Sequence, residues 1–310
     1  MGKSMIDLHP LYQANPKSKI ERIVRMALRG AAWIALSIAL FILAFVLWKG
    51  LTPFIVNDGS IFVFLTGHIW DPGAVNGLGK PLIGALPLIL GSFSVTILSV
   101  LATAPIAIGA AIFINEISPR IGKTFLQPVL ELLIGIPSVV YGFLGLSMIV
   151  PLIRNHIGGS GFGVAAAAVV LSAMMLPTVT CLAVNALKRV PPEFREASLA
   201  LGATRWQTIS RMVMTIARPG LCSAVIFGIS RAFGESLAVQ MVIGNAVVIP
   251  DSLFQPAATI TSILTMGMGN TVMGQTENNA LWSLALILMA MSCIFMIFMR
   301  LTGNLRRTFS

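Results

Sequence analysis

The chain has 310 residues, of which 56% are hydrophobic and only 10% are charged, and its net charge is +10. Soluble domains carry about 25% charged residues, so this composition excludes a soluble globular protein and indicates an integral membrane protein. The basic residues are not interleaved with aromatic side chains in a stripe but cluster at the ends of apolar segments. Their position indicates a membrane topology signal and excludes nucleic acid as a partner.

The N-terminal part of the chain, residues 1–82, is predicted to contain a cytoplasmic segment, one transmembrane helix and an outer loop. Residues 1–29 are polar and basic, whereas residues 31–48 are apolar throughout. About 18 apolar residues suffice to cross a hydrocarbon core of about 30 Å. A cleaved signal peptide is the alternative, but the long polar segment before the run favours a retained span. Turn-forming residues dominate 49–81, which indicates the loop.

The remainder, residues 83–302, is predicted to be a transmembrane domain, followed by a cytoplasmic tail at 303–310. Five further apolar segments cover residues 83–114, 125–153, 162–187, 221–243 and 281–299. Pro105 predicts a kink in the first of them. Residues 257–266 are apolar but too short to span, so we expect a re-entrant or interfacial helix there.

Six spans place both termini on the same side of the membrane. Of the 21 basic residues, only Lys49, Lys80 and Arg154 fall on the opposite side, and Arg231 lies within a span. Basic residues accumulate on the cytoplasmic side of membrane proteins. The sequence therefore predicts a multi-pass inner-membrane protein with both termini in the cytoplasm.

A polar segment, residues 188–219, separates two of the apolar spans. A Pro-Pro pair near its start suits the first turn of a helix, and Gly202 suits a left-handed helix C-cap. Thr204 and Gln207 have the spacing of a capping box that begins a second helix. The segment is therefore predicted to form two short helices joined by a glycine turn.

Within this segment, Glu196-Ala197-Ser198 followed by Gly202 resembles the EAA-x3-G motif of ABC importer permeases, which docks into the ATPase subunit. Ser198 replaces the second alanine of the motif, and the family's later I-x-L-P pattern is absent. An ordinary cytoplasmic loop is the alternative, but its position between two spans favours docking. The resemblance implies that Glu196, Ala197, Ser198 and Gly202 couple the chain to an ATPase, and we call residues 188–219 the coupling loop.

Two charged residues, Arg231 and Glu235, are predicted to lie within a span and on one helical face, because they are four residues apart. An arginine at the bilayer centre costs about 2.5–3.5 kcal/mol on insertion scales, so it should face a protein interior or a wet cavity. The two side chains either neutralise each other and only fix packing, or Arg231 binds a passing oxyanion. We favour the second interpretation.

Three residues of the segment 125–153 are further candidates for the substrate pathway. Glu131 either reaches the inner membrane interface or pairs with a basic group. Ser138 and Tyr141 adjoin the sequence Gly-Ile-Pro-Ser at 135–138, which predicts a helix interruption. Broken backbone at membrane depth often lines permeation routes, although a simple proline kink is the alternative.

Residues 135–142 (GIPSVVYG) and 231–239 (RAFGESLAV) resemble segments of phosphate-importer permeases. The segments 241–245 and 250–257 are nearer to the PstC-type subunit than to its PstA-type sister. The resemblance covers about residues 30–302 and implies an all-α, six-helix type I permease with a MetI-like core. It also implies a PstA-type sister permease, a PstB-type ATPase dimer and a PstS-type periplasmic phosphate-binding protein. Arg231 and Glu235 would then matter for phosphate passage.

These observations predict a subunit that passes inorganic phosphate into the cytoplasm and is not itself an enzyme. The chain contains no G-x-x-x-x-G-K-[ST] motif and no metal-ligand spacing of Cys or His, so we expect ATP and Mg²⁺ on the separate ATPase and no cofactor here. Membrane lipid is the expected surrounding. The alternatives are a permease for molybdate, sulfate or phosphonate, and a self-sufficient channel or secondary transporter, which would usually have repeated halves.

Overall fold

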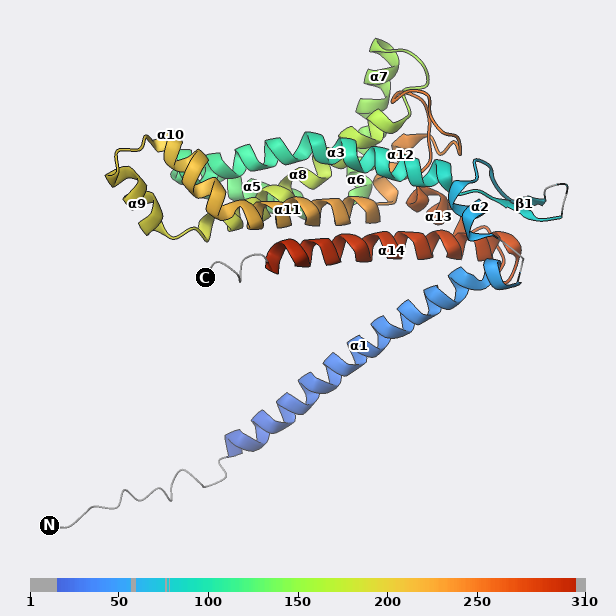
Figure 1. The fold of residues 1–310 in the computed structure, drawn as a ribbon, viewed down its shortest axis with the longest axis horizontal. Coiled ribbons are helices and arrows are strands. Elements are labelled where there is room, and N and C mark those ends of the chain that lie inside the picture. Colours follow the sequence, from blue (N-terminus) through green and yellow to red (C-terminus); the bar gives the residue numbers. More distant parts are fainter. Residues whose placement is uncertain (1–15, 57–59, 76, 78, 305–310) are drawn as a thin grey trace. The chain divides into compact units, whose positions relative to one another are not determined.

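The structure, a computed structural model, describes residues 16–304 except 57–59, 76 and 78. The first 15 residues of the predicted N-terminal segment and residues 305–310 of the predicted tail lie outside the described residues. Most of the described chain is helical (Figure 1). It contains 6 helical segments long and apolar enough to cross a membrane, which confirms the predicted number and the all-α class: Glu21–Ile55, Leu86–Ile117, Ser138–His156, Val164–Lys188, Arg205–Gly234 and Thr276–Phe298.

The chain divides into two compact units, Met1–Lys49 and Gly50–Ser310. The described part of the first unit is helical and belongs to α1 (Pro16–Val56). This helix contains the predicted span 31–48 and extends beyond it, because the preceding residues are mostly good helix formers.

The predicted outer loop at 49–81 is more ordered than the sequence indicated. After α1 it contains α2 (Ile61–Thr66) and the start of an antiparallel hairpin of β1 (Trp70–Val75) and β2 (Pro81–Ile83). A Cβ atom on Gly67 would lie 2.8 Å from the Cα of Gly84. The glycines that suggested an irregular loop therefore serve in part to let two backbone segments meet.

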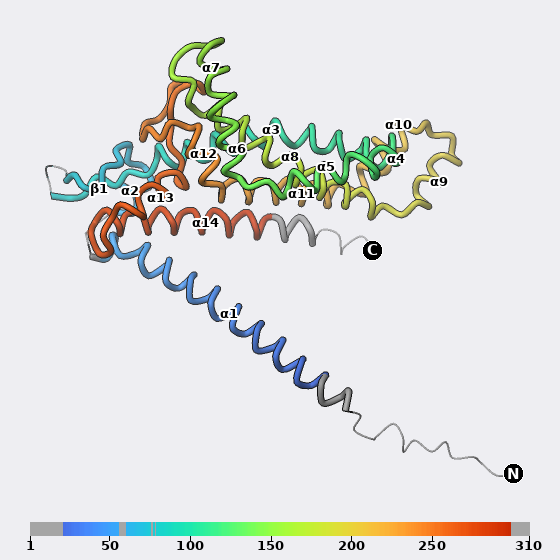
Figure 2. The backbone as a smooth tube through the Cα atoms, turned by 180° about the vertical axis from the view of Figure 1, so that it is seen from behind, coloured from blue at the N-terminus to red at the C-terminus, as the bar shows by residue number. Residues whose placement is uncertain are grey.

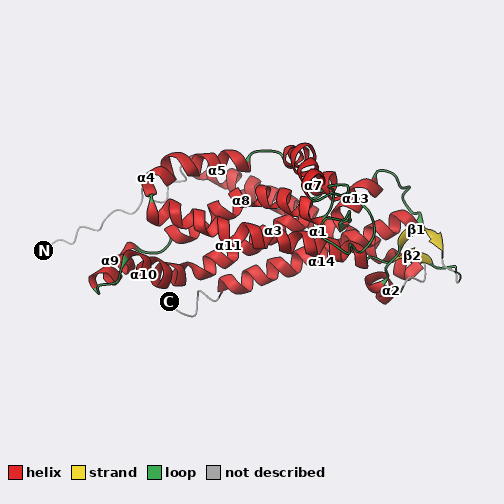
Figure 3. Ribbon diagram, turned by 90° about the horizontal axis from the view of Figure 1, so that it is seen from above, coloured by secondary structure: helices red, strands yellow, loops and turns green. Residues whose placement is uncertain are grey.

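Four long helices of the second unit pack side by side: α3 (Leu86–Ile112), α8 (Val164–Lys188), α11 (Met214–Gly234) and α14 (Thr276–Asn304). The helix α8 contacts both α3 and α11, and α11 also contacts α14 (Figure 3). The alanines at 166–168 of α8 are buried. Small residues at these positions allow the neighbouring helices to approach closely.

The predicted interruption at 135–138 is confirmed. The helix α5 (Gln127–Ile134) ends before it, and α6 (Ser138–Leu144) begins after it. A π-helical turn, Gly145–Ile149, then leads into α7 (Val150–His156). Towards the N-terminus, α5 is joined to α3 through two further π-helical turns, Phe113–Ile117 and Gly122–Leu126, which flank the short α4 (Pro119–Ile121).

The predicted span 221–243 is wrong at its C-terminal end. The helix α11 stops at Gly234, and a separate helix, α12 (Leu237–Ile243), follows. The apolar segment predicted at 257–266 forms α13 (Ile260–Met268), and Ile260 is fully buried. Its first turn therefore lies inside the protein rather than at a lipid interface.

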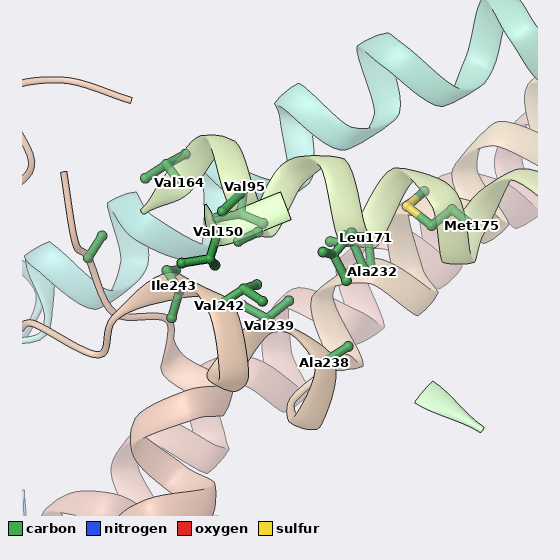
Figure 4. Packing of buried hydrophobic residues seen from close by; sticks show 14 of the residues in the cluster. Val95, Val150, Val164, Leu171, Met175, Ala232, Ala238, Val239, Val242 and Ile243 are labelled. Atoms are coloured by element: carbon green, nitrogen blue, oxygen red, sulfur yellow. The ribbon is translucent and has the colours of Figure 1, made fainter. Parts of the chain in front are cut away.

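The core next to α12 joins most of these elements. Figure 4 shows Val95 of α3, Val150 of α7, Leu171 of α8, Ala232 of α11 and Val239 of α12 in one buried apolar cluster. At one end of this unit lie the two short helices of the coupling loop, α9 (Pro192–Ala200) and α10 (Arg205–Gln207), and at the other end lie α2 and the hairpin (Figures 1 and 2). The helices of the bundle therefore separate the coupling loop from the hairpin region.

Candidate functional site

The coupling loop has the local structure that its sequence predicts. Pro192 occupies the first turn of α9. Gly202 has φ +82, and the amide of Ala203 donates to the carbonyl of Ser198 at 3.2 Å, which closes the helix as in a Schellman motif. The Thr204 hydroxyl accepts from the amide of Gln207, whose side chain accepts from the Thr204 amide, so the capping box is formed.

The surface of the coupling loop is unusually apolar for an exposed loop. Glu196 and Ala197 are exposed. Around them, four large apolar side chains have between 47% and 88% of their surface exposed: Phe194, Leu199, Leu201 and Trp206. An exposed apolar patch rimmed by polar groups marks a protein interaction surface.

Two of the predicted coupling residues shape the loop from within. Ser198 is buried, and its hydroxyl lies 3.0 Å from that of Thr208, at the start of the π-helical turn Thr208–Val213. A Cβ atom on Gly202 would meet nothing within 4 Å, so the glycine is required by backbone conformation and not by space. Glu196 and Ala197 are thus available for contact, whereas Ser198 and Gly202 hold the loop in shape.

The coupling loop is anchored to a turn that the sequence analysis did not single out. Arg195 of α9 forms an ion pair with Glu116, with 2.6 Å between Nη2 and Oε1. Arg205 of α10 donates to the backbone carbonyl of Glu116 and, at 3.4 Å, to that of Ile117. A signal was present, because Glu116 is an acidic residue in an inner turn that is otherwise basic.

The second candidate region surrounds Arg231, near the C-terminal end of α11. Its Nη1 donates to the hydroxyl of Thr178 in α8 at 2.6 Å. The predicted face shared with Glu235 does not exist, because α11 ends at Gly234 and Glu235 has extended backbone angles, φ −76 and ψ 126. No ion pair between Arg231 and Glu235 occurs in the described part of the chain.

Glu235 instead organises the turn between α11 and α12. Its carboxylate accepts from the amide of Ala238 at 3.3 Å, and its carbonyl accepts from the hydroxyl of Thr261 at 2.8 Å. The residue also lines a small cavity of about 10 Å³, which is close to the ~10–15 Å³ that one water molecule requires. The polar residues that share this lining are Ser92, Thr96, Thr259 and Thr261.

The break between α5 and α6 belongs to the same neighbourhood. The Tyr141 hydroxyl donates to the carbonyl of Leu133 at 3.1 Å and so bridges the break. The Tyr141 ring packs against the apolar cluster that contains Ala232 and Ala238. The close contact depends on Gly142, where a Cβ atom would lie 2.9 Å from the Cα of Ala238.

The remaining predicted pathway residues are placed less centrally. Ser138 is half-buried at the first position of α6. Glu131 is exposed, and its carboxylate accepts a hydrogen bond from the side-chain amide of Gln127 at 2.9 Å. The side-chain oxygen of Gln127 in turn accepts a hydrogen bond from Lys188 at 3.0 Å. Through Gln127, Glu131 is therefore connected to the first residue of the coupling loop.

Arg231 is the group in this region that is suited to an anion. Its partner in α8 is a neutral hydroxyl, and a guanidinium has five N–H donors in a fixed planar arrangement. The side chain is half-buried between helices, where a charge-assisted hydrogen bond is stronger than in water. The arrangement therefore offers a positioned cation with unused donors at a break in the bundle.

Comparisons with known proteins agree on one family. Residues 105–307 match the model of the binding-protein-dependent transport system inner membrane component. The chain is 48% identical to the probable ABC transporter permease protein YqgH of Bacillus subtilis, over 91% of both chains. It is 31% identical to the phosphate transport system permease protein PstC of Haemophilus influenzae, over 77% of this chain and 79% of that one.

Solved structures share the fold. A chain of the bacterial alginate ABC transporter in complex with an alginate pentasaccharide-bound periplasmic protein matches with a TM-score of 0.64 at 14% identity, over 91% of this chain and 94% of that one. A chain of the inward-facing MetNI methionine ABC transporter matches with a TM-score of 0.50 at 20% identity, over 71% and 94%. At these identities the likeness concerns the fold alone, which is that of ABC importer permeases.

Proposed function

This chain belongs to the family of binding-protein-dependent transport system inner membrane components, and we propose that it passes inorganic phosphate into the cytoplasm. Family membership makes it a multi-pass permease subunit of an ABC importer and not an enzyme. It implies two kinds of partner, a separate ATPase and a substrate-binding protein. The proposal concerns what is transported and how these partners act on the chain.

Phosphate is supported by relatives and by one feature of the site. Relatives with 30–31% identity are named phosphate transport system permease proteins. Within the bundle, Arg231 is held by Thr178 at 2.6 Å and keeps further donors available. A guanidinium binds two oxygens of a phosphate in one plane. This half-buried, neutrally paired arginine is the observation that carries the proposal.

The coupling loop is the surface that we assign to the ATPase. Its exposed apolar side chains surround Glu196 and Ala197, and such a surface suits a protein partner. In this proposal a PstB-type ATPase dimer, which binds ATP and Mg²⁺, docks there, and both termini and the coupling loop face the cytoplasm. A PstA-type sister permease completes the pore, and a PstS-type protein delivers phosphate from outside.

Transport then follows from movement of the coupling loop. When the ATPase pair closes on ATP, the loop moves with it and the bundle opens alternately to the two sides. The two breaks, at 135–137 and at Glu235, provide non-helical joints beside Arg231. An anion released by the binding protein would bind Arg231 in the outward-open state and leave when the joints rearrange.

The proposal is tested with the complete complex in proteoliposomes that contain ATP. We expect ATP-dependent uptake of labelled phosphate that requires the binding protein and is competed by unlabelled phosphate. Molybdate, sulfate and phosphonate should compete poorly. Uptake of one of these anions in place of phosphate would replace the assigned substrate, and flux through this chain without the ATPase would instead support a self-sufficient channel.

A further inference from the structure

The Arg195 guanidinium is surrounded by acceptors. It donates to both oxygens of Glu116, at 2.6 Å from Nη2 and at 3.2 Å from Nε. It also donates to the carbonyl of Val190 at 2.7 Å and to that of Leu187 at 3.3 Å. Only 25% of the Arg195 side chain and 10% of the Glu116 side chain are exposed. This is a bidentate, largely desolvated pair, the kind of ion pair whose geometry is well defined.

A second arginine reaches the same place from the other helix of the coupling loop. Arg205 of α10 donates to the carbonyls of Glu116 and Ile117. These carbonyls belong to the π-helical turn that continues α3, so they lie at the negative end of its helix dipole. Both helices of the coupling loop therefore hold one two-residue segment, Glu116-Ile117, which lies 79 residues before Arg195 in the chain.

The connection matters because α3 does not adjoin the coupling loop in the chain. The loop is continuous with α8 and α11, whereas α3 reaches it only through tertiary contacts. The same helix carries Ser92 and Thr96, which line the small cavity beside Glu235. A single helix therefore joins the segment held by the two arginines to the cavity beside Glu235, at the turn that follows Arg231 and the end of α11.

We propose that Arg195, Arg205 and Glu116 form a clamp that stays closed during transport and transmits movement of the coupling loop to α3. The three are positioning residues, since none of them touches substrate. Apolar packing also occurs here, because Ile114 of α3's extension lies in one buried cluster with Val190 and Val213. Apolar packing alone keeps the coupling loop and the end of α3 together but allows one to slide along the other. A bidentate ion pair also fixes their relative orientation. The inference rests on the chain's role in an ATP-driven importer and not on the identity of the anion.

The test replaces the clamp by a covalent link. Glu116→Cys and Arg195→Cys are combined in a chain whose three native cysteines, Cys181, Cys222 and Cys293, are changed to serine. The full complex in proteoliposomes is assayed for ATP hydrolysis and for labelled anion uptake. Without a link, we expect hydrolysis to continue while uptake per ATP falls about 3- to 30-fold, the range in which residues along a coupling route act.

A short bifunctional methanethiosulfonate that joins the two thiols should restore uptake per ATP, and a reductant should abolish the recovery. The matched control is Glu21→Cys with Arg25→Cys, an exposed ion pair of 2.6 Å in α1, for which neither the substitutions nor the link should matter. Normal uptake per ATP in the unlinked 116/195 pair would overturn the proposal. Linked complexes that hydrolyse ATP without uptake would also overturn it, because the contact would then have to open.

A conservative variant covers the case in which the cysteine pair does not assemble. Arg195→Lys keeps the positive charge, but a lysine ammonium cannot donate to the Glu116 carboxylate and to two backbone carbonyls in one plane as the guanidinium does. We therefore expect uptake per ATP to fall while the ATPase still co-purifies. An unchanged ratio in this variant would contradict the clamp. If the parent complex transports another oxyanion, the phosphate assignment fails, and the same comparison with that anion still tests the clamp.

Discussion

Two arginines of this chain have opposite environments. Arg195 in the coupling loop is surrounded by a carboxylate and two carbonyls, and its pair with Glu116 is 2.6 Å long. Arg231 in the bundle has one neutral partner, the Thr178 hydroxyl, also at 2.6 Å. Both side chains are largely or partly withdrawn from solvent, so burial does not distinguish them.

The difference lies in how many donors remain. A guanidinium with most of its donors used by the protein stabilises one arrangement of its neighbours, whereas one with several unused donors is prepared for a ligand. The comparison assigns a structural and transmitting role to Arg195 and an anion-binding role to Arg231. Substitution of Arg195 should therefore lower the stability of the permease, whereas substitution of Arg231 should lower anion uptake.

The largest effect is expected from Arg195→Ala. The substitution leaves the Glu116 carboxylate, which is 10% exposed, without its cation. Removing one member of a buried ion pair costs about 3–5 kcal/mol, and we expect about 3 kcal/mol here because the pair retains some solvent contact. The measurement is the thermal stability of the purified permease in detergent.

The control for this prediction is the double variant Glu116→Ala with Arg195→Ala. Removing both partners leaves no uncompensated charge, so most of the stability should return. If the double variant were as unstable as Arg195→Ala, the cost would come from lost packing and not from the unpaired carboxylate.

Arg231→Ala should leave stability nearly unchanged and strongly reduce transport. A hydrogen bond to a charged group contributes about 1.5–3 kcal/mol, so loss of the guanidinium should lower uptake roughly 10- to 150-fold at limiting phosphate. Uptake is measured together with co-purification of the ATPase, which should persist. A variant that transports at the normal rate with normal expression would remove Arg231 from the pathway.

The variant Thr178→Val distinguishes the orientation of the Arg231 side chain from its direct contact with the anion. It keeps the shape of the side chain and removes the hydroxyl that accepts from Arg231. We expect a smaller loss than in Arg231→Ala, seen mainly as a raised KM, because the guanidinium remains but is less well oriented. An equal loss in both variants would mean that the hydroxyl itself takes part in passage.

The comparison also separates what the sequence predicts from what it does not. The coupling loop follows local rules: Gly202 and the Thr204–Gln207 capping box act within a few residues, and both were predicted. The six spans follow from apolar length alone. The break at 135–137 was likewise predicted from its glycine and proline. These residue types do not end every helix, because Pro219 and Gly220 lie inside α11.

The partners of the two arginines depend on contacts between distant segments. Thr178 lies 53 residues from Arg231, and Glu116 lies 79 residues from Arg195. The end of α11 at Gly234 was missed, because residues 231–236 contain no proline and the apolar residues 237–243 follow them. The hydrogen bond from Thr261 to the Glu235 carbonyl, which holds the break, joins segments that lie 26 residues apart. The hairpin β1–β2 was missed although its pairing is local, because its residues include many turn formers, which are typical of an irregular loop.

Gly202→Ala tests the glycine turn of the coupling loop, which depends on local backbone conformation. Gly202 has φ +82 and open space around its Cα, so the cost comes from the backbone alone. A left-handed conformation costs a residue other than glycine roughly 1–2 kcal/mol. We expect weaker binding of the ATPase to the purified permease with little change in the bundle, and Gly202→Asn, which tolerates this conformation better, should lose less.

The smallest effect is expected from Ser198→Ala, which introduces the alanine found at this position of the EAA motif. Ser198 and Thr208 are both buried, and their hydroxyls lie 3.0 Å apart. Loss of one hydroxyl leaves the other without this partner and should cost about 1 kcal/mol, whereas Ser198→Ala with Thr208→Val should be nearly neutral. Both variants are compared with the parent chain by their thermal stability in detergent. A strong loss of ATPase binding with unchanged stability would instead place Ser198 in the docking contact, although it is buried beneath the exposed surface around Glu196.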